Sequence, residues 1–498
     1  MATTKTNLTR KAAYTAAEFY LDDYTKTLFP LRANKVLAEA GFAKLLSFAR
    51  SGISTHSFLP QRRVSAMKVG SHIRRTIKLD PVAEVFFYDL VFKHRSIFRK
   101  PTSQKRASFG YRFASGRPLD ATSSYRGFKG AASEYTKTYK FGLTFDVASY
   151  FNSIYHHDLV GWMGEKVSDS TDIELFGKFL REINSGRSVD CLPQGLYPAK
   201  MIGNDFLKFL DNANKLKSTR LIRFMDDIAI FSNNREDLLA DFYVIQDLLG
   251  QKGLSINPSK TRFIEKDSAD IRREVDSVRR GLLKKRRHLI INGYDVTIEE
   301  SDSPRNLDSK ELSRLKQMLT QPHLDEEDAE LVLALMGAHS RDVLLRFEDL
   351  LKEFPHLAKN MYVFSKNITD RTALCDVILK YIKNATVIPE YQLFWIGMIL
   401  EDYLLDTRHA GELIDKLFTH PWSTSISKAK ILEISDKKFG LPELREEHLK
   451  EGKSDWLAWS AAVGTRTANK ASRNYVLKYF SNASPLNRII AEIVSGLP

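Results

Sequence analysis

The chain has 498 residues, enough for about three domains. Hydrophobic residues make up 43% and charged residues 27%, a balance that excludes a disordered, collagen-like or low-complexity protein. Lysine and arginine outnumber the acidic residues by 75 to 61, and the net charge of +14 predicts a polyanionic partner, either nucleic acid or an anionic membrane surface.

Neither the cysteines nor the apolar segments indicate secretion or a membrane. Cys191 and Cys375 lie far apart and belong to no CxxC pair, so we expect buried free thiols in a reducing cytoplasm. The first residues lack the apolar core of a signal peptide. The longest apolar run, 393–400, is far shorter than the ~20 residues of a membrane span. We therefore expect a cytoplasmic protein without a membrane segment.

The first 60 residues are predicted to form a helical segment. Apolar residues recur at three- and four-residue steps over 11–24 and 33–48, and Pro30 separates the two stretches. Residues 60–100 interleave basic with apolar residues, either as a surface that follows phosphates or as a solvated helix face. The cations of its first half are Arg62, Arg63, Lys68, Arg74, Arg75 and Lys78. Residues 101–140 have the composition of loops and short strands.

Strands and helices alternate over 141–265, and a hairpin is predicted over 288–300 because Asn292–Gly293 favours a type I′ turn. Residues 301–306 have the composition of a linker. Beyond them, amphipathic stretches punctuated by prolines predict an antiparallel helical stack of the repeat type. We expect an α+β fold with a helical segment at 1–60, a mixed domain at 61–300 and an all-α domain at 301–498.

Four sequence blocks contain the candidate functional residues. Asp146 ends a predicted strand in LTFDVASYFNSI, 143–154, and a turn runs into a helix in LPQGLYPA, 192–199. Asp226 and Asp227 lie between apolar runs in IRFMDDIAIF, 222–231, as at the tight turn of a hairpin. The last block is GLSINPSKT, 253–261.

Adjacent aspartates in an apolar strand pair are costly unless something compensates their charge. A hard divalent metal with oxygen ligands is the natural compensation. Enough chain separates Asp146 from Asp226 for a helix and a return strand to bring the two together. Carboxylates of two strands can then hold two Mg²⁺ ions about 3.5–4 Å apart, which activate a hydroxyl and stabilise a leaving pyrophosphate.

In this order, the four blocks resemble the palm of reverse transcriptases, whose motifs run FDxxxxF, LPQG, FMDD and GLxxNxxKT. The resemblance covers residues 60–265. It implies fingers and a palm over 61–300, built on an antiparallel sheet with helices. It also implies a polymerase that takes deoxynucleoside triphosphates and uses two Mg²⁺ ions, with Mn²⁺ as an alternative.

The resemblance implies a role for each matching residue. Asp146 and Asp226 are the main metal ligands, with the backbone carbonyl of Val147, and Asp227 completes the acidic turn. Phe151 matches the bulky residue that excludes a ribose 2′-hydroxyl, Gln194 contacts the incoming nucleotide, and Lys260 protonates the leaving pyrophosphate. Looser matches make further cations candidate triphosphate contacts, namely Arg74, Arg75, Lys78 and Arg112.

Each of these features also has a structural interpretation. Phe151 can pack under a helix, and Lys260 can be a surface lysine. His156 and His157 are expected on a helix surface, because adjacent helical residues point apart. Phe224 and Phe231 are expected in the core. The basic run 272–287 is either a solvated helix or a grip on a nucleic-acid backbone.

The layout of a basic N-terminal region, a palm and a long helical C-terminal domain resembles the abortive-infection (Abi) reverse transcriptases of bacteria. The form carried by P2-like prophages is the nearer match, and AbiK is a more distant one. This resemblance implies HEAT-like helices in place of a thumb, a homo-oligomer (trimer or hexamer) and antiviral defence against phage. It also implies DNA synthesis without template from a protein tyrosine, which leaves single-stranded DNA covalently attached. The tyrosines of the first helix are Tyr14, Tyr20 and Tyr24.

Three classes of function follow from the sequence. The first is a protein-primed DNA polymerase in abortive infection. The second is a template-copying reverse transcriptase of the retron or intron type. The third is a scaffold that binds nucleic acid without catalysis, against which the three aspartates argue, because a scaffold has no need of charges that repel each other without metal.

Overall fold

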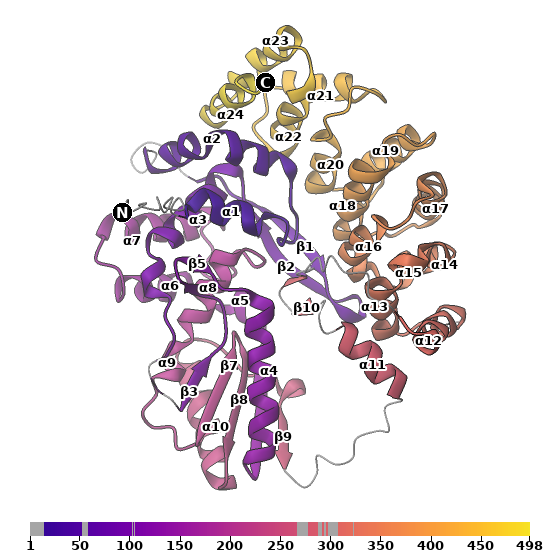
Figure 1. Ribbon diagram of the computed structural model, residues 1–498. Coiled ribbons are helices and arrows are strands. Elements are labelled where there is room, and N and C mark those ends of the chain that lie inside the picture. The colour runs from indigo at the N-terminus through magenta and orange to yellow at the C-terminus, as the bar shows by residue number, and fades with distance from the viewer. Residues whose placement is uncertain are drawn as a thin grey trace, which may run out of the picture.

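The computed structural model describes residues 14–51, 58–101, 103, 105–265, 277–286, 291–292, 295–296, 307–321 and 323–498 (Figure 1). Two N-terminal helices open the described chain, α1 (Ala16–Tyr24) and α2 (Arg32–Ser51). Thr15 caps α1, because its side chain accepts from the Glu18 N–H and the Glu18 carboxylate accepts from the Thr15 N–H. Both helices pack on α3 (Pro81–Lys93) and share one hydrophobic core with the rest of the N-terminal half.

A two-stranded antiparallel hairpin, β1 (Arg62–Met67) and β2 (Ile73–Lys78), precedes α3. Of the two interpretations of residues 60–78, the solvated helix face is therefore wrong. Buried Val64 and Ala66 alternate with less buried neighbours, the period of two that a half-buried strand requires. We call these two strands the fingers hairpin.

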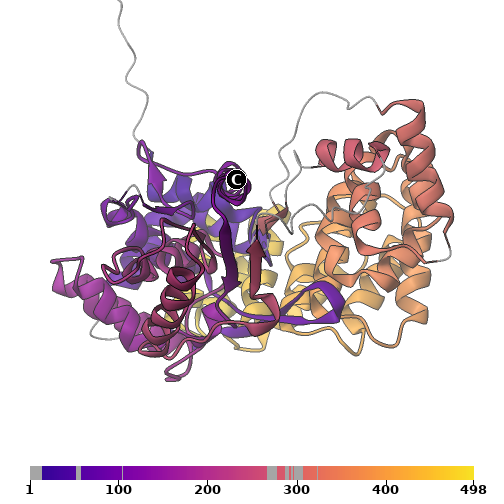
Figure 2. The ribbon, with the colours of Figure 1, turned by 90° about the horizontal axis from the view of Figure 1, so that it is seen from below.

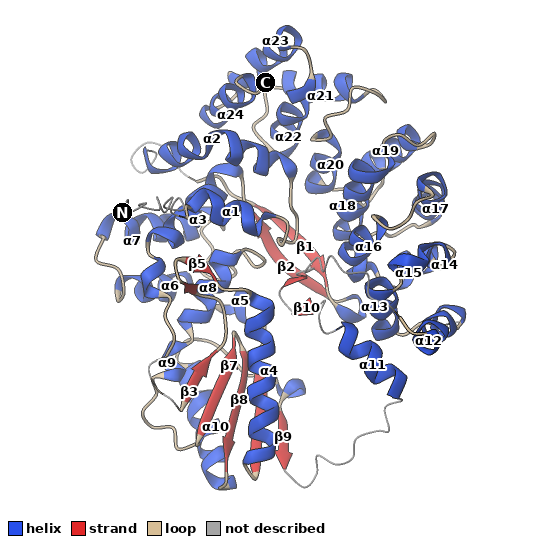
Figure 3. Cartoon of the chain, viewed as in Figure 1, coloured by secondary structure: helices blue, strands red, loops and turns tan. Residues whose placement is uncertain are grey.

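The largest sheet of the described residues has five strands in the order β3-β7-β8-β6-β9 (Figure 3). The pair β3·β7 is parallel and the other pairs are antiparallel, so the sheet is largely antiparallel, as predicted, with one parallel pair. Helices α4 and α10 pack against this sheet. The bounds are β3 (Arg106–Ser108), α4 (Ala121–Thr138), β6 (Phe141–Asp146), β7 (Arg220–Phe224), β8 (Asp227–Ser232), α10 (Arg235–Gly250) and β9 (Arg262–Glu265).

Shorter elements connect the strands of this sheet. A small hairpin precedes α4, and five helices lie between β6 and β7. They are β4 (Phe113–Ala114), β5 (Arg117–Pro118), α5 (Tyr150–Ser153), α6 (His156–Gly164), α7 (Ser170–Ile183), α8 (Tyr197–Phe206) and α9 (Lys208–Asp211). Phe224 and Phe231 are buried in the core, as predicted.

The predicted hairpin and linker lie largely outside the described residues. The short strands β10 (Ile291–Asn292) and β11 (Asp295–Val296) pair antiparallel, whereas Gly293 and residues 301–306 are not described. Of the basic run 272–287, residues 277–286 form α11 (Ser277–Arg286). Its Leu282 is buried in the core of the C-terminal helices, so α11 packs with them although it precedes residue 301.

The C-terminal residues form an arc of helices that we call the helical array (Figure 1). The arc leads away from the five-stranded sheet and returns to α2, against which its last helices pack. The bounds are α12 (Ser309–Thr320), α13 (Glu326–Leu335), α14 (Ser340–Leu344), α15 (Phe347–Glu353), α16 (Ala358–Ser365), α17 (Arg371–Asn384), α18 (Glu390–Ile399), α19 (Ala410–Thr419), α20 (Ser425–Leu432), α21 (Leu441–Lys450), α22 (Trp456–Gly464), α23 (Lys470–Ser481) and α24 (Pro485–Ser495).

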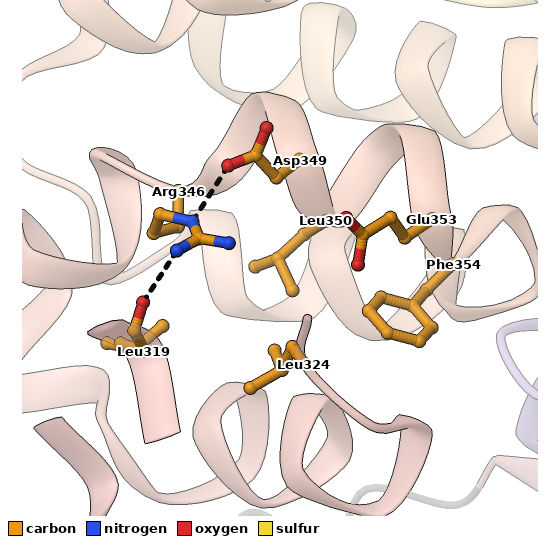
Figure 4. A pocket seen from close by; sticks show the side chains of 7 residues that line it. All are labelled: Leu319, Leu324, Arg346, Asp349, Leu350, Glu353 and Phe354. Carbon is orange, nitrogen blue, oxygen red and sulfur yellow. Dashed lines mark hydrogen bonds and ion pairs between the residues drawn. The ribbon is translucent and has the colours of Figure 1, made fainter. Parts of the chain in front are cut away.

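Arginine side chains help to join neighbouring helices of the array. Arg346 donates to the carbonyl oxygens of Leu319 at 2.9 Å and Gln321 at 3.1 Å, at the C-terminus of α12, and pairs with Asp349 at 2.7 Å. Figure 4 shows this cation beside Leu324 and its apolar neighbours. The space they enclose leaves no room for a water molecule, so this contact is part of the packing.

The helical array also contacts the N-terminal half. Phe29 packs edge-on against Phe394 with ring centroids 5.2 Å apart, and Arg32 pairs with Asp402 at 2.7 Å. The fingers hairpin reaches towards the array in Figure 2, and β1 packs against α18. Here burial raises the pKa of Glu390 to about 7, although Arg62 of β1 acts to lower it.

Across the described ranges, no helix combines the length and the apolar character that a bilayer crossing needs. The apolar helix α18 is buried between neighbouring helices of the array.

Candidate active site

Two aspartates lie opposite each other at the ends of neighbouring central strands, and a third lies in the adjacent turn. In the β7–β8 hairpin, Phe224 pairs with Asp227, which leaves Met225 and Asp226 as the turn. Met225 has a φ of 58°, a backbone strain of the kind that concentrates at functional sites. Asp146, the last residue of β6, pairs in register with Asp227. The predicted tight turn and the approach of the two acidic segments are therefore confirmed.

The fourth sequence block places Lys260 beside these carboxylates. Ile256 forms a bridge with Val147, and the Asn257 N–H donates to the Asp146 carbonyl at 2.9 Å. The short 3-10 helix Pro258–Lys260 follows, and Lys260 Nζ lies 2.6 Å from Asp146 Oδ2. This hydrogen bond raises the pKa of the Lys260 ammonium, so the side chain is cationic at neutral pH.

The residue types suit a divalent metal, but the described chain presents no finished metal site. Asp146 is 7% exposed, and its Oδ1 is buried without a hydrogen-bond partner. Burial raises the pKa of Asp227, although Lys129 and Lys260 act to lower it. Among the described residues, however, no three His, Cys, Asp or Glu side chains converge to ligand distance. The orphaned oxygen and the all-oxygen donor set fit Mg²⁺, provided that the carboxylates turn towards one another.

Lys260→Met is expected to strengthen binding of Mn²⁺ to the protein by up to about fivefold, because it removes a cation that competes for Asp146. Electron paramagnetic resonance of free Mn²⁺ measures this affinity. Lys380→Met is the matched control, because Lys380 is 65% exposed and pairs with Glu348 in the array, against 64% for Lys260. Weaker Mn²⁺ binding in Lys260→Met would contradict the expectation.

The LPQG block lies against the fingers hairpin. Gln194 is buried, and its backbone carbonyl accepts a hydrogen bond from Thr76 Oγ1 of β2 at 2.5 Å. Gly195 has a φ of 107°, and a side chain there would meet Leu28 at 2.9 Å, so only glycine fits this turn. Helix α8 begins two residues later, with Pro198 in its first turn.

Phe151 packs under a helix in this structure. It lies in α5, 2% exposed, and a Cβ placed on Gly203 of α8 would be 3.2 Å from its ring. The adjacent Tyr150 donates to the Gly203 carbonyl at 2.6 Å. The role of Phe151 in excluding a ribose 2′-hydroxyl remains a prediction.

The cations of the fingers hairpin divide between two environments. Lys68, at the tip, has a pKa lowered first by burial and then by Arg74 and Lys260, while Asp226 and Asp146 act to raise it. The tip therefore lies within electrostatic reach of Asp146 and Asp226, which the sequence did not reveal. Lys78, in contrast, is 6% exposed and pairs with Glu84 at 2.5 Å, so it is not available to a triphosphate.

Other candidate residues take structural positions. Arg112 donates to the Ser108 carbonyl at 3.1 Å. His156 and His157 begin α6, where His157 is exposed and His156 is partly buried, with their ring centroids 5.7 Å apart. Both cysteines are free and buried, and burial raises the pKa of Cys191 to about 12.

The tyrosines of the first helix are held by hydrogen bonds. Tyr20 donates to Glu84 at 2.9 Å, and Tyr24 donates to the Pro30 carbonyl at 2.7 Å, and both are buried. Tyr14 is half-buried and donates to Asp22 at 2.8 Å. Tyr20 belongs to the hydrophobic core of the N-terminal half, and Tyr24 is buried beside it.

A mixed sheet whose central hairpin turn carries two carboxylates, with a third on the neighbouring strand, defines a polymerase-type palm. Residues 96–280 match the family described as reverse transcriptase (RNA-dependent DNA polymerase). The chain therefore contains a reverse-transcriptase domain, followed by a largely helical C-terminal region. This match supports a nucleotidyltransferase of the nucleic-acid polymerase type.

Comparisons with other proteins add little beyond this domain. No curated protein matches the chain significantly. Apo telomerase from Candida tropicalis is similar at 11% identity and TM-score 0.31, over 84% of this chain and 73% of that one. Telomerases with a telomeric RNA fragment, from Candida albicans and Candida tropicalis, are both 13% identical with TM-scores of 0.29 and 0.31. They cover 77% and 78% of this chain, which spans 66% and 64% of theirs, and such low scores carry no inference.

Proposed function

We propose that the chain is a Mg²⁺-dependent DNA polymerase of the reverse-transcriptase type that acts in abortive infection, a cytoplasmic defence against phage. It synthesises DNA without template from a protein tyrosine, and it works as a homo-oligomer, a trimer or hexamer. The observation that carries the polymerase activity is the register of Asp146 with Asp227 beside the Asp226 turn. The untemplated, protein-primed activity draws support from the helical array, which follows the palm where other reverse transcriptases have a thumb.

The proposed roles follow from where each residue lies. Asp146, Asp226 and Asp227, with the Val147 carbonyl, would hold two Mg²⁺ ions, with Mn²⁺ as an alternative. The ions supply activation of the attacking hydroxyl and neutralise charge on the pyrophosphate. Lys260 is protonated, since the hydrogen bond to Asp146 raises its pKa, and we assign to it the protonation of the leaving pyrophosphate.

The remaining roles concern the deoxynucleoside triphosphate. Gln194 contacts the nucleotide from a loop that Thr76 fixes to the fingers hairpin. Phe151 forms the wall beneath the sugar. Arg74, Arg75 and Lys68 of the hairpin supply positive charge for the triphosphate, whereas Lys78 is occupied by Glu84.

Primer-free labelling tests the proposal. Purified protein is incubated with Mg²⁺ and labelled deoxynucleotides without template, beside an Asp226→Asn/Asp227→Asn variant, and resolved on denaturing gels before and after protease. Label that migrates with wild-type protein alone, and that protease releases, supports protein-primed synthesis. Activity only with an annealed RNA template and DNA primer would favour a template-copying enzyme. Inactivity in both assays would favour the nucleic-acid-binding scaffold.

Phe151→Val is expected to raise incorporation of ribonucleotides relative to deoxynucleotides by about 10- to 100-fold, because a smaller side chain leaves room for the 2′-hydroxyl. Single-nucleotide incorporation with each triphosphate measures the ratio. Phe176→Val, which trims an equally buried ring in α7, controls for general loosening of the core. An unchanged ratio would leave Phe151 a packing residue.

A further inference from the structure

A buried carboxylate at the start of the LPQG loop joins three parts of the candidate site. Asp190 is 8% exposed and has a φ of 61°, a left-handed conformation that aspartate tolerates better than most residues. It lies four residues before Gln194, so its position sets where the loop leaves the preceding segment.

Both oxygens of Asp190 are used, by different elements. Oδ2 accepts from Arg63 Nη1 of β1, in the fingers hairpin, and Oδ1 accepts from Asn152 Nδ2 of α5. Asn152 follows Phe151 directly, so the carboxylate ties the helix that carries Phe151 to the loop that carries Gln194.

Arg63 and Asn152 each make a second contact that completes the connection. Arg63 Nη2 donates to Asn184 Oδ1, and the Asn184 amide donates to the Val189 carbonyl at 2.6 Å. Asn152 Nδ2 also lies 3.5 Å from the Arg75 carbonyl of β2. The fingers hairpin is thus bonded to α5 and to both ends of the loop 184–194.

The placement of these residues favours a role in geometry over one in stability. The Arg63 side chain is 35% exposed, and ion pairs of such exposure contribute about 0–1 kcal/mol. In contrast, displacement of a substrate-binding group by about 1 Å can change a rate by about 100-fold.

We propose that Asp190 is a positioning residue for the incoming nucleotide, which fixes the separation of Phe151, Gln194 and the fingers hairpin. The role rests on the proposed polymerase function, since it concerns the triphosphate that this function requires. Asp190 itself touches no reacting atom. Its loss lets the three elements separate, which weakens nucleotide binding and relaxes sugar selection.

Kinetics of Asp190→Ala test this role. We expect KM for a deoxynucleotide to rise about 10-fold or more, kcat to stay within about twofold, and ribonucleotide discrimination to fall. Arg63→Gln is expected to reproduce the KM defect, and the double variant to be no worse than either single variant, because the two residues act as one unit. Asp190→Asn, which retains one acceptor, is expected to fall between wild type and Asp190→Ala.

Asp89→Ala is the matched control, because it breaks a 2.6 Å ion pair between Asp89 of α3 and Arg50 of α2. Neither of these helices carries a candidate site residue. Unchanged KM and discrimination in Asp190→Ala, or a loss of kcat accompanied by a fall in Tm, would overturn the positioning role.

Binding of a fluorescent deoxynucleotide in Ca²⁺ separates this role from the proposed function. Wild type that binds but does not polymerise, with weaker binding in Asp190→Ala, supports the role although the function fails. Wild type that binds no nucleotide overturns both.

Discussion

Asp146→Asn is expected to lower nucleotide incorporation by about 1,000-fold. The substitution removes one negative charge from the strand-end carboxylates while keeping the size of the side chain. Asp146 is paired in register with Asp227 and carries an orphaned buried oxygen, so it is the carboxylate best placed to share an ion with the Asp226 turn. Incorporation of labelled deoxynucleotide under single-turnover conditions measures the loss.

The substitution should leave the thermal stability of the protein nearly unchanged. Asparagine reduces repulsion among the three carboxylates but loses the ion pair with Lys260, which is 64% exposed, so Asp146→Asn is expected to change Tm little in the absence of metal. Glu236→Gln, on the exposed face of α10, is the control and is expected to leave both rate and Tm unchanged. Retention of more than a tenth of wild-type activity would mean that Asp146 does not hold the reactive metal.

Arg223→Met is expected to lower the free energy of unfolding by about 3–5 kcal/mol, because it leaves Asp211 buried without its cation. Both side chains are fully buried, and Arg223 Nη2 lies 2.6 Å from Asp211 Oδ2. Burial acts to lower the pKa of Arg223, and Asp211 outweighs this effect, so the pKa is raised. Arg223 also donates to the Asn204 carbonyl at 2.8 Å, which satisfies the guanidinium beneath the catalytic hairpin.

Urea denaturation followed by circular dichroism measures this loss. Arg223→Met/Asp211→Leu is expected to recover most of it, since the unpaired charge is removed together with its partner. Lys352→Met, which breaks an exposed pair with Glu348, is expected to leave the free energy of unfolding nearly unchanged. A loss of the same small size in Arg223→Met would show that water or another cation reaches Asp211.

The sequence predicted those parts of the site that local pattern determines. Asp226 and Asp227 stand between apolar runs, and such runs around a polar pair predict a strand, a tight turn and a return strand. Asp146 at the end of its own apolar run predicted the third strand end. The four blocks also specified the reverse-transcriptase domain, because their order is far more specific than any one block.

Contacts between distant segments were not predictable in the same way. Lys78 was predicted as a triphosphate contact because the local sequence shows no partner for it. Its partner Glu84 lies in α3, which begins after the cap residue Asp80, and the ion pair forms only once α3 folds back beside β2. The hairpin over 62–78 has too many basic residues for its period of two to stand out. The bonds of Asp190 join segments 38 and 127 residues away, and no local pattern encodes such pairs.

Adjacent residues of β1 face different parts of the molecule. Arg62 acts on Glu390 of α18, while Arg63 binds Asp190 beside the nucleotide loop, as the alternation of side chains along a strand allows. The strand therefore contacts both the helical array and the segment that leads into the loop of Gln194. If a ligand of the array displaces α18 and changes the affinity for nucleotide, then nucleotide must change the affinity for that ligand by the same factor. In the proposed phage defence, the response to a trigger that binds the array would then depend on the cellular supply of deoxynucleotides.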